Sequence, residues 1–226
     1  MKRQRLLAVL GGMILFGVSS LTHASLSIIG TASYKGESVS LIYDNDSLLT
    51  WLDYSNPRDA WQVQLNWAAS LNNPGVLQYH FYPGVTVDWA GEVWRLSGVD
   101  EAQLVLGRHS CSDMGHLFFD ELNVGAESGW PPVYVTEAEL NAKEFDNLRE
   151  YWYWTGYDVT LMFETALAFD MRYGELSTRR YHGTAYGLAV HSGQVTVVPV
   201  PGAISLLGSG LVGLLILRKR RNEDRA

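Results

Sequence analysis

One short stretch of the chain concentrates side chains that commonly bind metals. It reads His109-x-Cys111-x-Asp113-x-x-His116. A zinc site needs three or four such ligands converging tetrahedrally, usually at a recognisable spacing. Ser112 is suited to cap a helix that begins at Asp113, and this helix places Asp113 and His116 on one face while His109 and Cys111 stay in a loop. We therefore expect no metal site in this stretch.

Three carboxylates elsewhere offer oxygen ligands for calcium. Asp44, Asp46 and Asp53 lie close together in sequence, but the loop glycine and the distal bidentate glutamate of an EF-hand are missing. Short polar side chains also form turns by bonding their own backbone. We favour a turn at 44–47 and predict no cofactor, while calcium near Asp44 and Asp46 stays an open alternative.

Signals for catalysis are weak. Asp120 and Glu121 are paired carboxylates of the kind that glycosidases use, but adjacent helix residues point in different directions. The chain also has no Gly-x-Ser-x-Gly nucleophile elbow. Cys111, the only cysteine, excludes an internal disulfide. It is expected to be a small buried hydrophobe, with pairing between chains as the alternative.

Arg95 and a few aromatic residues are candidate ligand contacts. The forked donors of Arg95 could bind a carboxylate or sulfate. We favour a structural role, in which Arg95 is buried and bonded to backbone carbonyls or to a carboxylate. Trp130, Tyr151 and Trp152 flank predicted loops, so we expect their rings to be partly exposed and able to contact a sugar.

Charge excludes one class of partner. The full chain has a formal net charge of -7, but residues 25–198 carry 9 Lys and Arg against 22 Asp and Glu, a net charge of -13. Nucleic-acid binding depends on cationic contacts to phosphates. We therefore expect no nucleic acid among the partners.

The hydrophobic pattern predicts an α+β domain. Alternation at period two predicts short strands at 26–28, 39–43, 48–52, 85–89, 93–96, 151–154, 165–170 and 185–190. A first helix is expected to open with Asn56 as its cap and Pro57 in its first turn. Its predicted buried stripe is Trp61, Leu65, Ala68 and Leu71.

Two further helices carry start signals. Ser112 can cap a helix over 113–122, and Thr136 with Glu139 forms a capping box. The second helix presents its apolar residues on one face: Met114, Leu117, Phe118 and Leu122. Two or three helices among many short strands indicate one α+β domain over residues 25–196.

Both ends of the chain carry targeting patterns. Residues 1–24 combine a basic start, an apolar stretch and a small-residue cleavage site that ends at Ala24, which predicts a signal peptide for the export translocon. From Val195 to Leu217 the tail carries no charge, close to the ~20 residues that a helix needs to cross a bilayer. The basic cluster after Leu217 belongs on the cytoplasmic side.

The tail, residues 197–226, resembles a known sorting signal. Val198 leads into Pro199, Val200, Pro201, Gly202 and Ala203, followed by the apolar span Ile204–Leu217 and by Arg218, Lys219, Arg220 and Arg221. This order resembles the PEP-CTERM signal in its Val-Pro-x-Pro-Gly-Ala form, although Val200 stands where the Pro-Glu-Pro form has Glu. The resemblance implies export in a Gram-negative bacterium and cleavage by exosortase near the motif. An ordinary C-terminal anchor is the alternative.

The domain between these ends resembles a family of bacterial surface domains without an agreed function, shared with the C-terminal domain of Lcl-type collagen-like adhesins. The matching segments are 49–53, 61–68, 94–96, 113–117, 153–156 and 186–190, with Ser97 where the family usually has Pro. Their signature residues are Trp51, Trp61, Trp94, Arg95, His116 and Trp154. The resemblance implies a C-type-lectin-like or formylglycine-generating-enzyme-like fold and transfers no catalytic residue.

Together these resemblances imply an envelope-sorted, non-enzymatic surface or matrix protein. Its precursor is expected in the inner membrane and the mature protein at the cell surface or in the extracellular matrix. The implied partner is exopolysaccharide or another glycan. The alternative is an enzyme on a formylglycine-generating-like scaffold.

Overall fold

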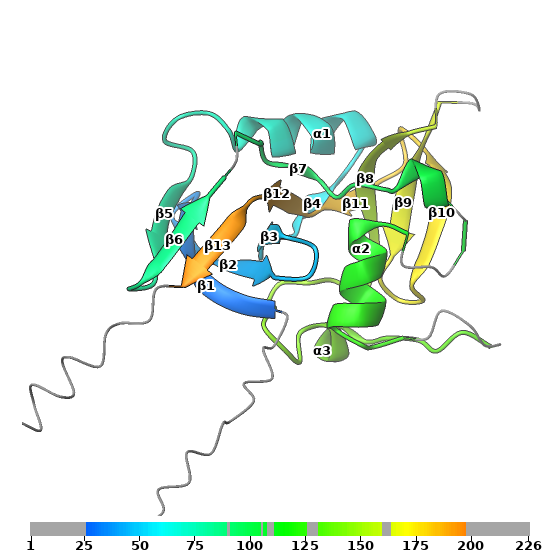
Figure 1. Ribbon diagram of the computed structural model, residues 1–226. Helices are drawn as coiled ribbons and strands as arrows, with labels where there is room; N and C mark the ends of the chain where they lie inside the picture. Colours follow the sequence, from blue (N-terminus) through cyan, green and yellow to red (C-terminus); the bar gives the residue numbers. More distant parts are fainter. Residues whose placement is uncertain are drawn as a thin grey trace, which may run out of the picture.

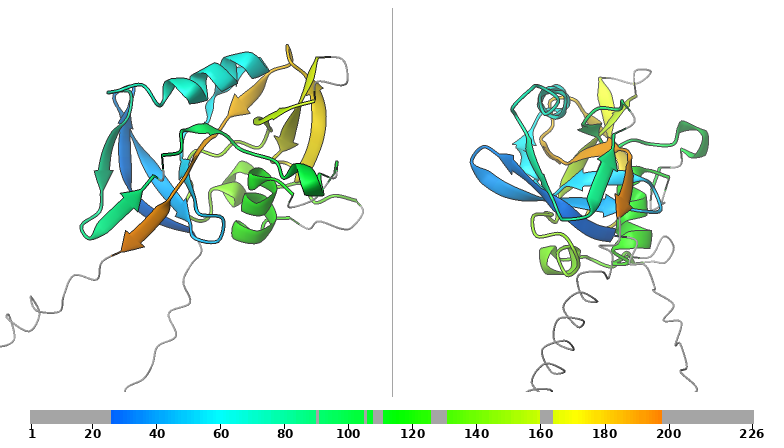
Figure 2. Two further views of the ribbon diagram at one scale, coloured as in Figure 1. Left: turned by 45° about the horizontal axis from the view of Figure 1, so that its top comes forward. Right: turned by 60° about the vertical axis from the view of Figure 1, so that its left-hand side comes forward.

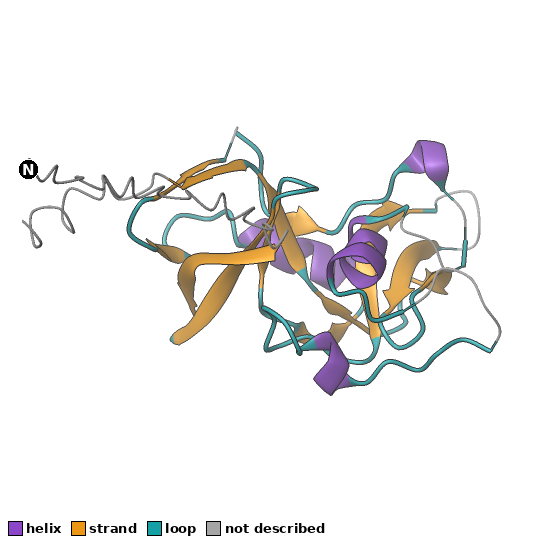
Figure 3. Cartoon of the chain, turned by 60° about the horizontal axis from the view of Figure 1, so that its bottom comes forward, coloured by secondary structure: helices purple, strands orange, loops and turns teal. Residues whose placement is uncertain are grey.

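The computed structural model describes residues 26–89, 91–104, 106–107, 111–125, 131–159 and 164–197. Strands make up most of the ordered elements and helices are few (Figure 3), so the prediction of an α+β domain is confirmed in a sheet-rich form. The predicted signal peptide, Trp130 and the tail from Val198 onward lie outside the described residues. Within the described ranges, no helix has the length and apolar character needed to cross a membrane.

The larger sheet joins strands from both ends of the domain. It is antiparallel throughout and has six strands in the order β5-β1-β2-β3-β12-β7. The strand bounds in that order are Gln78–Phe81, Leu26–Tyr34, Glu37–Asp44, Leu49–Leu52, Ala189–Ser192 and Arg95–Leu96. Strand β12 comes late in the chain yet lies between β3 and β7 (Figure 1), so long-range pairing completes this sheet.

A second sheet has five strands in the order β10-β9-β8-β11-β4. Their bounds in that order are Glu175–Arg180, Thr165–Asp170, Trp152–Asp158, Ala185–Gly187 and Asn56–Asp59. The sequence predicted one strand over 185–190, but it is divided at Leu188 into β11 and β12, which belong to different sheets. The chain therefore passes from one sheet to the other at this residue.

A two-stranded sheet pairs β6, Val85–Asp88, with β13, Gln194–Val197. The ends of the described domain emerge on the same side of the molecule (Figure 2). A three-residue 3₁₀ turn, η1 Glu101–Gln103, follows β7. Strands β4, β10 and β13 were not predicted from the sequence, and the region of β5 was left open between loop and strand.

The first helix begins later than predicted. Helix α1 spans Trp61–Ser70, and Ala60 precedes it without a side-chain cap from any described residue. Asn56 and Pro57 instead belong to strand β4, which pairs with β11 at the edge of its sheet. Proline is tolerated on an edge strand because no ladder bond is required from its nitrogen. The side chain of Asn56 is used elsewhere, since its Nδ2 donates to Gln64 Oε1 at 2.8 Å.

The buried face of α1 is also rotated from the predicted one. Trp61, Ala68 and Leu71 are buried as expected, but Leu65 is half-buried. Gln64 and Trp67 take its place in the interior. The buried Gln64 amide donates to the carbonyls of Pro57 and Ala185 at 2.7 and 3.1 Å, which ties α1 to β4 and β11.

The second and third helices are confirmed. Ser112 Oγ accepts a hydrogen bond from Gly115 N at 2.9 Å and caps α2, Asp113–His116. The chain continues as a π-helical turn, η2 Leu117–Glu121, closed by Leu122 N donating to Leu117 O at 2.8 Å. The capping box of Thr136 and Glu139 opens α3, Glu137–Leu140.

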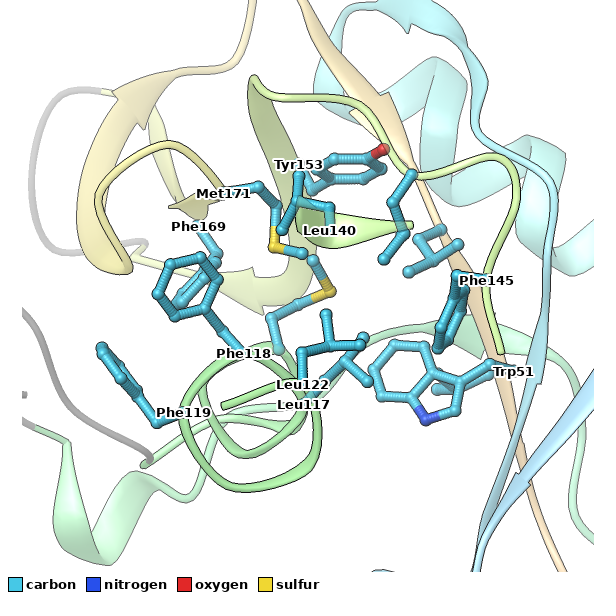
Figure 4. Packing of buried hydrophobic residues seen from close by; sticks show 14 of the residues in the cluster. Trp51, Leu117, Phe118, Phe119, Leu122, Leu140, Phe145, Tyr153, Phe169 and Met171 are labelled. Atoms are coloured by element: carbon cyan, nitrogen blue, oxygen red, sulfur yellow. The ribbon is translucent and has the colours of Figure 1, made fainter. Parts of the chain in front are cut away.

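The apolar face of α2 and η2 fills one of two core clusters. Met114, Leu117 and Phe118 are fully buried, and Leu122 is 2% exposed. Figure 4 shows Phe118 beside Phe169, and Leu117 and Leu122 near Trp51. The second cluster packs around Trp61, Trp94 and Trp154 between α1 and the sheets. The four tryptophans of the predicted signature are therefore core residues.

Candidate functional site

The described surface has an apolar groove between α1 and β7. It encloses about 560 Å³, and β8 and the segment after β7 complete its walls. Most of the lining is aliphatic, and the remaining side chains bring amide, guanidinium and aromatic groups. The lining residues are Leu65, Asn66, Ala68, Ala69, Asn72, Val93, Trp94, Arg95, Leu96, Gly98, Val99, Gly156 and Tyr157.

Asn72 holds the two walls of the groove together. Its Oδ1 accepts from the backbone N of Trp94 at 2.8 Å, and its Nδ2 donates to the Trp94 carbonyl at 3.0 Å. This pair of bonds imitates a strand ladder and fixes the chain just before β7. On the other side, Gly156 N of β8 donates to Ser97 O at 2.8 Å. The groove therefore lies between backbone segments that are held by hydrogen bonds.

Arg95 is the charged side chain among the described lining residues. Its Nη1 donates to Leu96 O at 3.0 Å and to Asp113 Oδ2 at 2.9 Å. The same Asp113 oxygen accepts from Gly98 N. The predicted bonds to a carbonyl and a carboxylate are confirmed, but the predicted burial is wrong, because 38% of the Arg95 side chain is exposed. Both of these bonds use Nη1, and the partly exposed guanidinium can still present other donors to a ligand.

Trp94 forms the buried floor beside Arg95. It is 2% exposed, and its Nε1 donates to Tyr79 Oη at 2.7 Å. The Trp94 ring also contacts His191 at 5.3 Å between centroids. Burial lowers the pKa of the His191 imidazole. The His191 imidazole is therefore uncharged near neutral pH.

No protein-family model, curated protein or solved structure matches this chain. The groove and the sequence resemblances are therefore the basis for a functional proposal.

Two of the predicted ligand-contact rings, those of Tyr151 and Trp152, lie outside the groove. Tyr151 and Trp152 are half-buried, as expected from their positions next to loops. Their rings already contact guanidinium groups: Arg58 lies 4.6 Å and Arg172 5.1 Å from the Tyr151 centroid, and Arg179 lies 4.7 Å from that of Trp152. Such cation–π contacts compete with a sugar for the ring faces.

Tyr157 is the groove aromatic that sequence analysis missed. It lies in β8, three residues after Trp154, and is half-buried. The predicted strand ended at Trp154, whereas β8 continues to Asp158. Extending the predicted strand beyond Trp154 would have included Tyr157. Its place in the same groove as Arg95 depends on the packing of β7 against β8.

Asp113 and His116, two of the predicted metal-type residues, have different partners in the structure. His109 lies outside the described residues, and Asp113 bonds Arg95. Cys111 is half-buried rather than buried, which corrects the expectation from its type. His116 instead faces a different set, with Nε2 at 3.5 Å from Asp44 Oδ2 and 3.4 Å from Glu121 Oε1. Asp120 and Glu121 point in different directions, as expected, because the Asp120 side chain is 51% exposed and the Glu121 side chain is 2% exposed, although each lies near one ring nitrogen of His116.

Asp44 and Asp53, two of the three carboxylates considered for calcium, also bond different parts of the chain. Asp44 forms the predicted turn, since its Oδ1 accepts from Asp46 N at 2.9 Å and Ser47 N at 3.1 Å. Asp53 is buried and accepts from Asp146 N and Asn147 N at 3.0 and 3.1 Å. The turn interpretation of Asp44 is therefore confirmed, and Asp53 serves the loop before β8.

Proposed function

We propose that this chain is an exported, envelope-sorted, non-enzymatic protein that binds a glycan in the groove between α1 and β7. The groove carries this proposal, because it combines an apolar surface with Arg95 and Tyr157. Ligand sites in proteins typically pair a mostly apolar cavity with a few placed polar groups. A sugar ring has the same division, with C–H groups on its face and oxygens at its edge.

Arg95 and Tyr157 suit different parts of such a ligand. The Tyr157 ring can stack on the apolar face of a sugar, as aromatic rings do in amphipathic contacts. The forked donors of Arg95 suit a carboxylate or paired hydroxyls at the edge of the ring. The acidic domain disfavours a highly charged polyanion. We therefore propose a neutral or sparsely acidic exopolysaccharide as the ligand class.

The composition of the groove favours binding over catalysis. General acid–base catalysis needs a positioned group that titrates near the working pH. Among the described lining residues, the ionisable side chains are Arg95 and Tyr157, and histidine and carboxylates, the side chains that most often serve as general acid or base, are absent. The alternative, an enzyme on a formylglycine-generating-like scaffold, would require a reactive group that the described lining does not provide.

The remaining parts of the proposal come from the sequence. Residues 1–24 direct export, residues 25–196 form the binding domain, and residues 197–226 form the sorting signal. The domain itself is proposed to be C-type-lectin-like. The span Ile204–Leu217 holds the precursor in the inner membrane until exosortase cuts near Pro201, which releases the protein to the surface or matrix.

A groove-blocking variant tests the binding site. Ala69 is exposed on α1 and lines the groove, so Ala69→Trp fills the space without removing a buried contact. Val63→Trp is the matched control, because Val63 is 45% exposed on the same helix and is not among the lining residues. The measurement is binding of the full chain in detergent micelles to a glycan array and to exopolysaccharide from the host.

We expect Ala69→Trp and Tyr157→Ala to lose most of the binding, while Val63→Trp and Tyr82→Ala keep it. Tyr82 is 50% exposed and belongs to the loop after β5, so it controls for the loss of a tyrosine. Equal binding by all four variants would show that the groove is not the glycan site.

A further inference from the structure

A second group of side chains lies apart from the groove, around His116. Its Nε2 is buried and has no hydrogen-bond partner among the residues that the structure describes. The nearest charged oxygens are Asp44 Oδ2 at 3.5 Å and Glu121 Oε1 at 3.4 Å. The three ligand atoms all lie within 4.8 Å of one another. A buried nitrogen is thus placed between two carboxylates without a satisfied bond.

The other ring nitrogen explains how the imidazole is held. His116 Nδ1 lies 2.9 Å from Asp120 Oδ2, one helical turn further on. When Nδ1 donates its proton to Asp120, the lone pair of Nε2 points at the two remaining carboxylates. A carboxylate that orients a histidine in this way is the usual companion of a metal-bound imidazole.

Burial of the two carboxylates adds to the case for a cation. Asp44 is fully buried and Glu121 is 4% exposed. Buried charges are costly unless they are paired or coordinate a metal. Lys143 Nζ donates to the backbone oxygen of Glu121 and brings some positive charge to this turn. A cation between the carboxylate oxygens and Nε2 would neutralise the cluster directly.

The local backbone is built to bring these groups together. Asp44 is held rigidly, because its carboxylate accepts bonds from the backbone N of Asp46 and Ser47 and from Ser47 Oγ. Glu121 is the last residue of the π-helical turn η2, five residues after His116, and its carboxylate lies near Nε2. Single π turns are rare inside helices and are frequent at functional sites.

We propose that Asp44, His116 and Glu121 bind a divalent transition-metal ion, for which Zn²⁺ has the best fit. Ligands at ~2.0–2.1 Å from a tetrahedral zinc ion are ~3.3–3.4 Å apart. The two distances from Nε2, 3.4 and 3.5 Å, match this separation. Ca²⁺ and Mg²⁺ prefer oxygen ligands alone, so the imidazole disfavours both ions. Three protein ligands leave a fourth position for water or another ligand.

Metal titration of the full chain tests this site. The chain is purified in detergent micelles, stripped with a chelator, dialysed and titrated with ZnCl₂, CaCl₂ and MgCl₂ by calorimetry, with bound metal counted by mass spectrometry. We expect one zinc per chain and no comparable uptake of calcium or magnesium. Co²⁺ in the same site should show the strong visible bands of tetrahedral coordination.

Matched variants separate this site from other metal ligands. His116→Gln and Glu121→Gln should lower zinc affinity at least about 100-fold, and Asp120→Asn about 10–100-fold through the orientation of the ring. His80→Gln, at an exposed histidine of β5, and Cys111→Ser should leave affinity unchanged. Circular dichroism of the metal-free variants checks that each one folds, and zinc should raise the melting temperature of the parent but not of His116→Gln.

Two results would overturn the proposal. One is the failure of the folded parent chain to take up stoichiometric zinc, which would show that Asp44, His116 and Glu121 do not form a metal site. The other is zinc affinity that survives in His116→Gln and Glu121→Gln but is lost in Cys111→Ser. Neither result depends on glycan binding, so this proposal and the proposed function are tested separately.

Discussion

Replacement of Gln64 by leucine tests whether a buried amide joins α1 to the second sheet. The Gln64 side chain is fully buried, and it accepts from Asn56 Nδ2 and donates to the carbonyls of Pro57 and Ala185. Leucine has a similar volume, so the change removes the hydrogen bonds and leaves little empty space. Each buried polar group that loses its partner costs ~1–3 kcal/mol.

The cost can be assigned group by group. Asn56 is 9% exposed, so its amide, once it has lost Gln64 as an acceptor, has the full desolvation cost of a buried donor without a partner. The carbonyl of Ala185 is also interior and loses one of its bonds, whereas exposed Pro57 can bond water instead. We expect Gln64→Leu to lower the free energy of unfolding by ~2–4 kcal/mol. Urea titration gives this difference, provided that the slope against denaturant stays constant.

The control is Gln62→Leu on the exposed face of the same helix. Gln62 bonds Asn66 one turn later, and an exposed pair of this kind contributes only ~0.2–0.5 kcal/mol. If Gln64→Leu cost no more than this control, the amide would not be what fixes α1 on β4 and β11. The late start of the helix would then need another explanation.

Three further predictions follow from burial and from the tail. Leu117→Ala should lower the free energy of unfolding by ~2–5 kcal/mol in urea titrations, because Leu117 is fully buried. Leu65→Ala should lower it by clearly less, because Leu65 is only half-buried. Equal losses would contradict the assignment of Leu65 to the half-buried face of α1. Burial lowers the pKa of His191 below its ordinary value of 6.5, so the folded chain binds fewer protons, and its stability should fall as the pH drops below about 6.5. His191→Gln should flatten this fall between about pH 7.5 and about pH 5.5, and a profile parallel to the parent would refute the assignment. The double variant Pro199→Ala, Pro201→Ala should leave uncut precursor in the membrane fraction. Mass spectrometry of the mature protein from the unaltered chain locates the cut. An intact C-terminus through Arg221 in that protein would show that the tail is a permanent anchor.

Local signals in the sequence located the elements that local chemistry controls. Ser112, Thr136 and the turn at Asp44 act on backbone groups within three residues, and the role of each was predicted, with Glu139 also predicted as the partner of Thr136. The same kind of signal failed at Asn56. The Asn56 amide bonds Gln64 instead of capping a helix, β4 pairs with β11, and the helix begins at Trp61.

Strands were missed where sequence pattern carries little information. Strand β10, Glu175–Arg180, is mostly polar, and it lies at the edge of its sheet, where a single bridge with Gly107 pairs its outer side. Strand β12 was predicted as the continuation of β11, because nothing local marks the change of sheet at Leu188. Long-range pairing with β3 and β7 decides that boundary.

In both candidate sites, sequence identified some of the residues, while long-range packing decides which residues lie together. The Trp94-Arg95-Leu96 stretch was singled out from sequence, and its bonds were predicted, yet the open groove beside it depends on how α1 packs. The group around His116 joins Asp44 and Glu121, which are far apart in the chain, and it depends on a π turn that propensity does not foresee. The predicted metal stretch contained His116 but none of its partners.

Helix α2 connects the two sites physically. Asp113, at its start, accepts from Arg95 and from Gly98 N at the wall of the groove. His116, at its end, faces Asp44 and Glu121. The cap at Ser112 and the buried side chains Met114 and Leu117 hold this single turn in place, so neither end can shift far without the other. A metal that fixes His116 would therefore also restrain Asp113, and through it the guanidinium that the groove presents to a ligand.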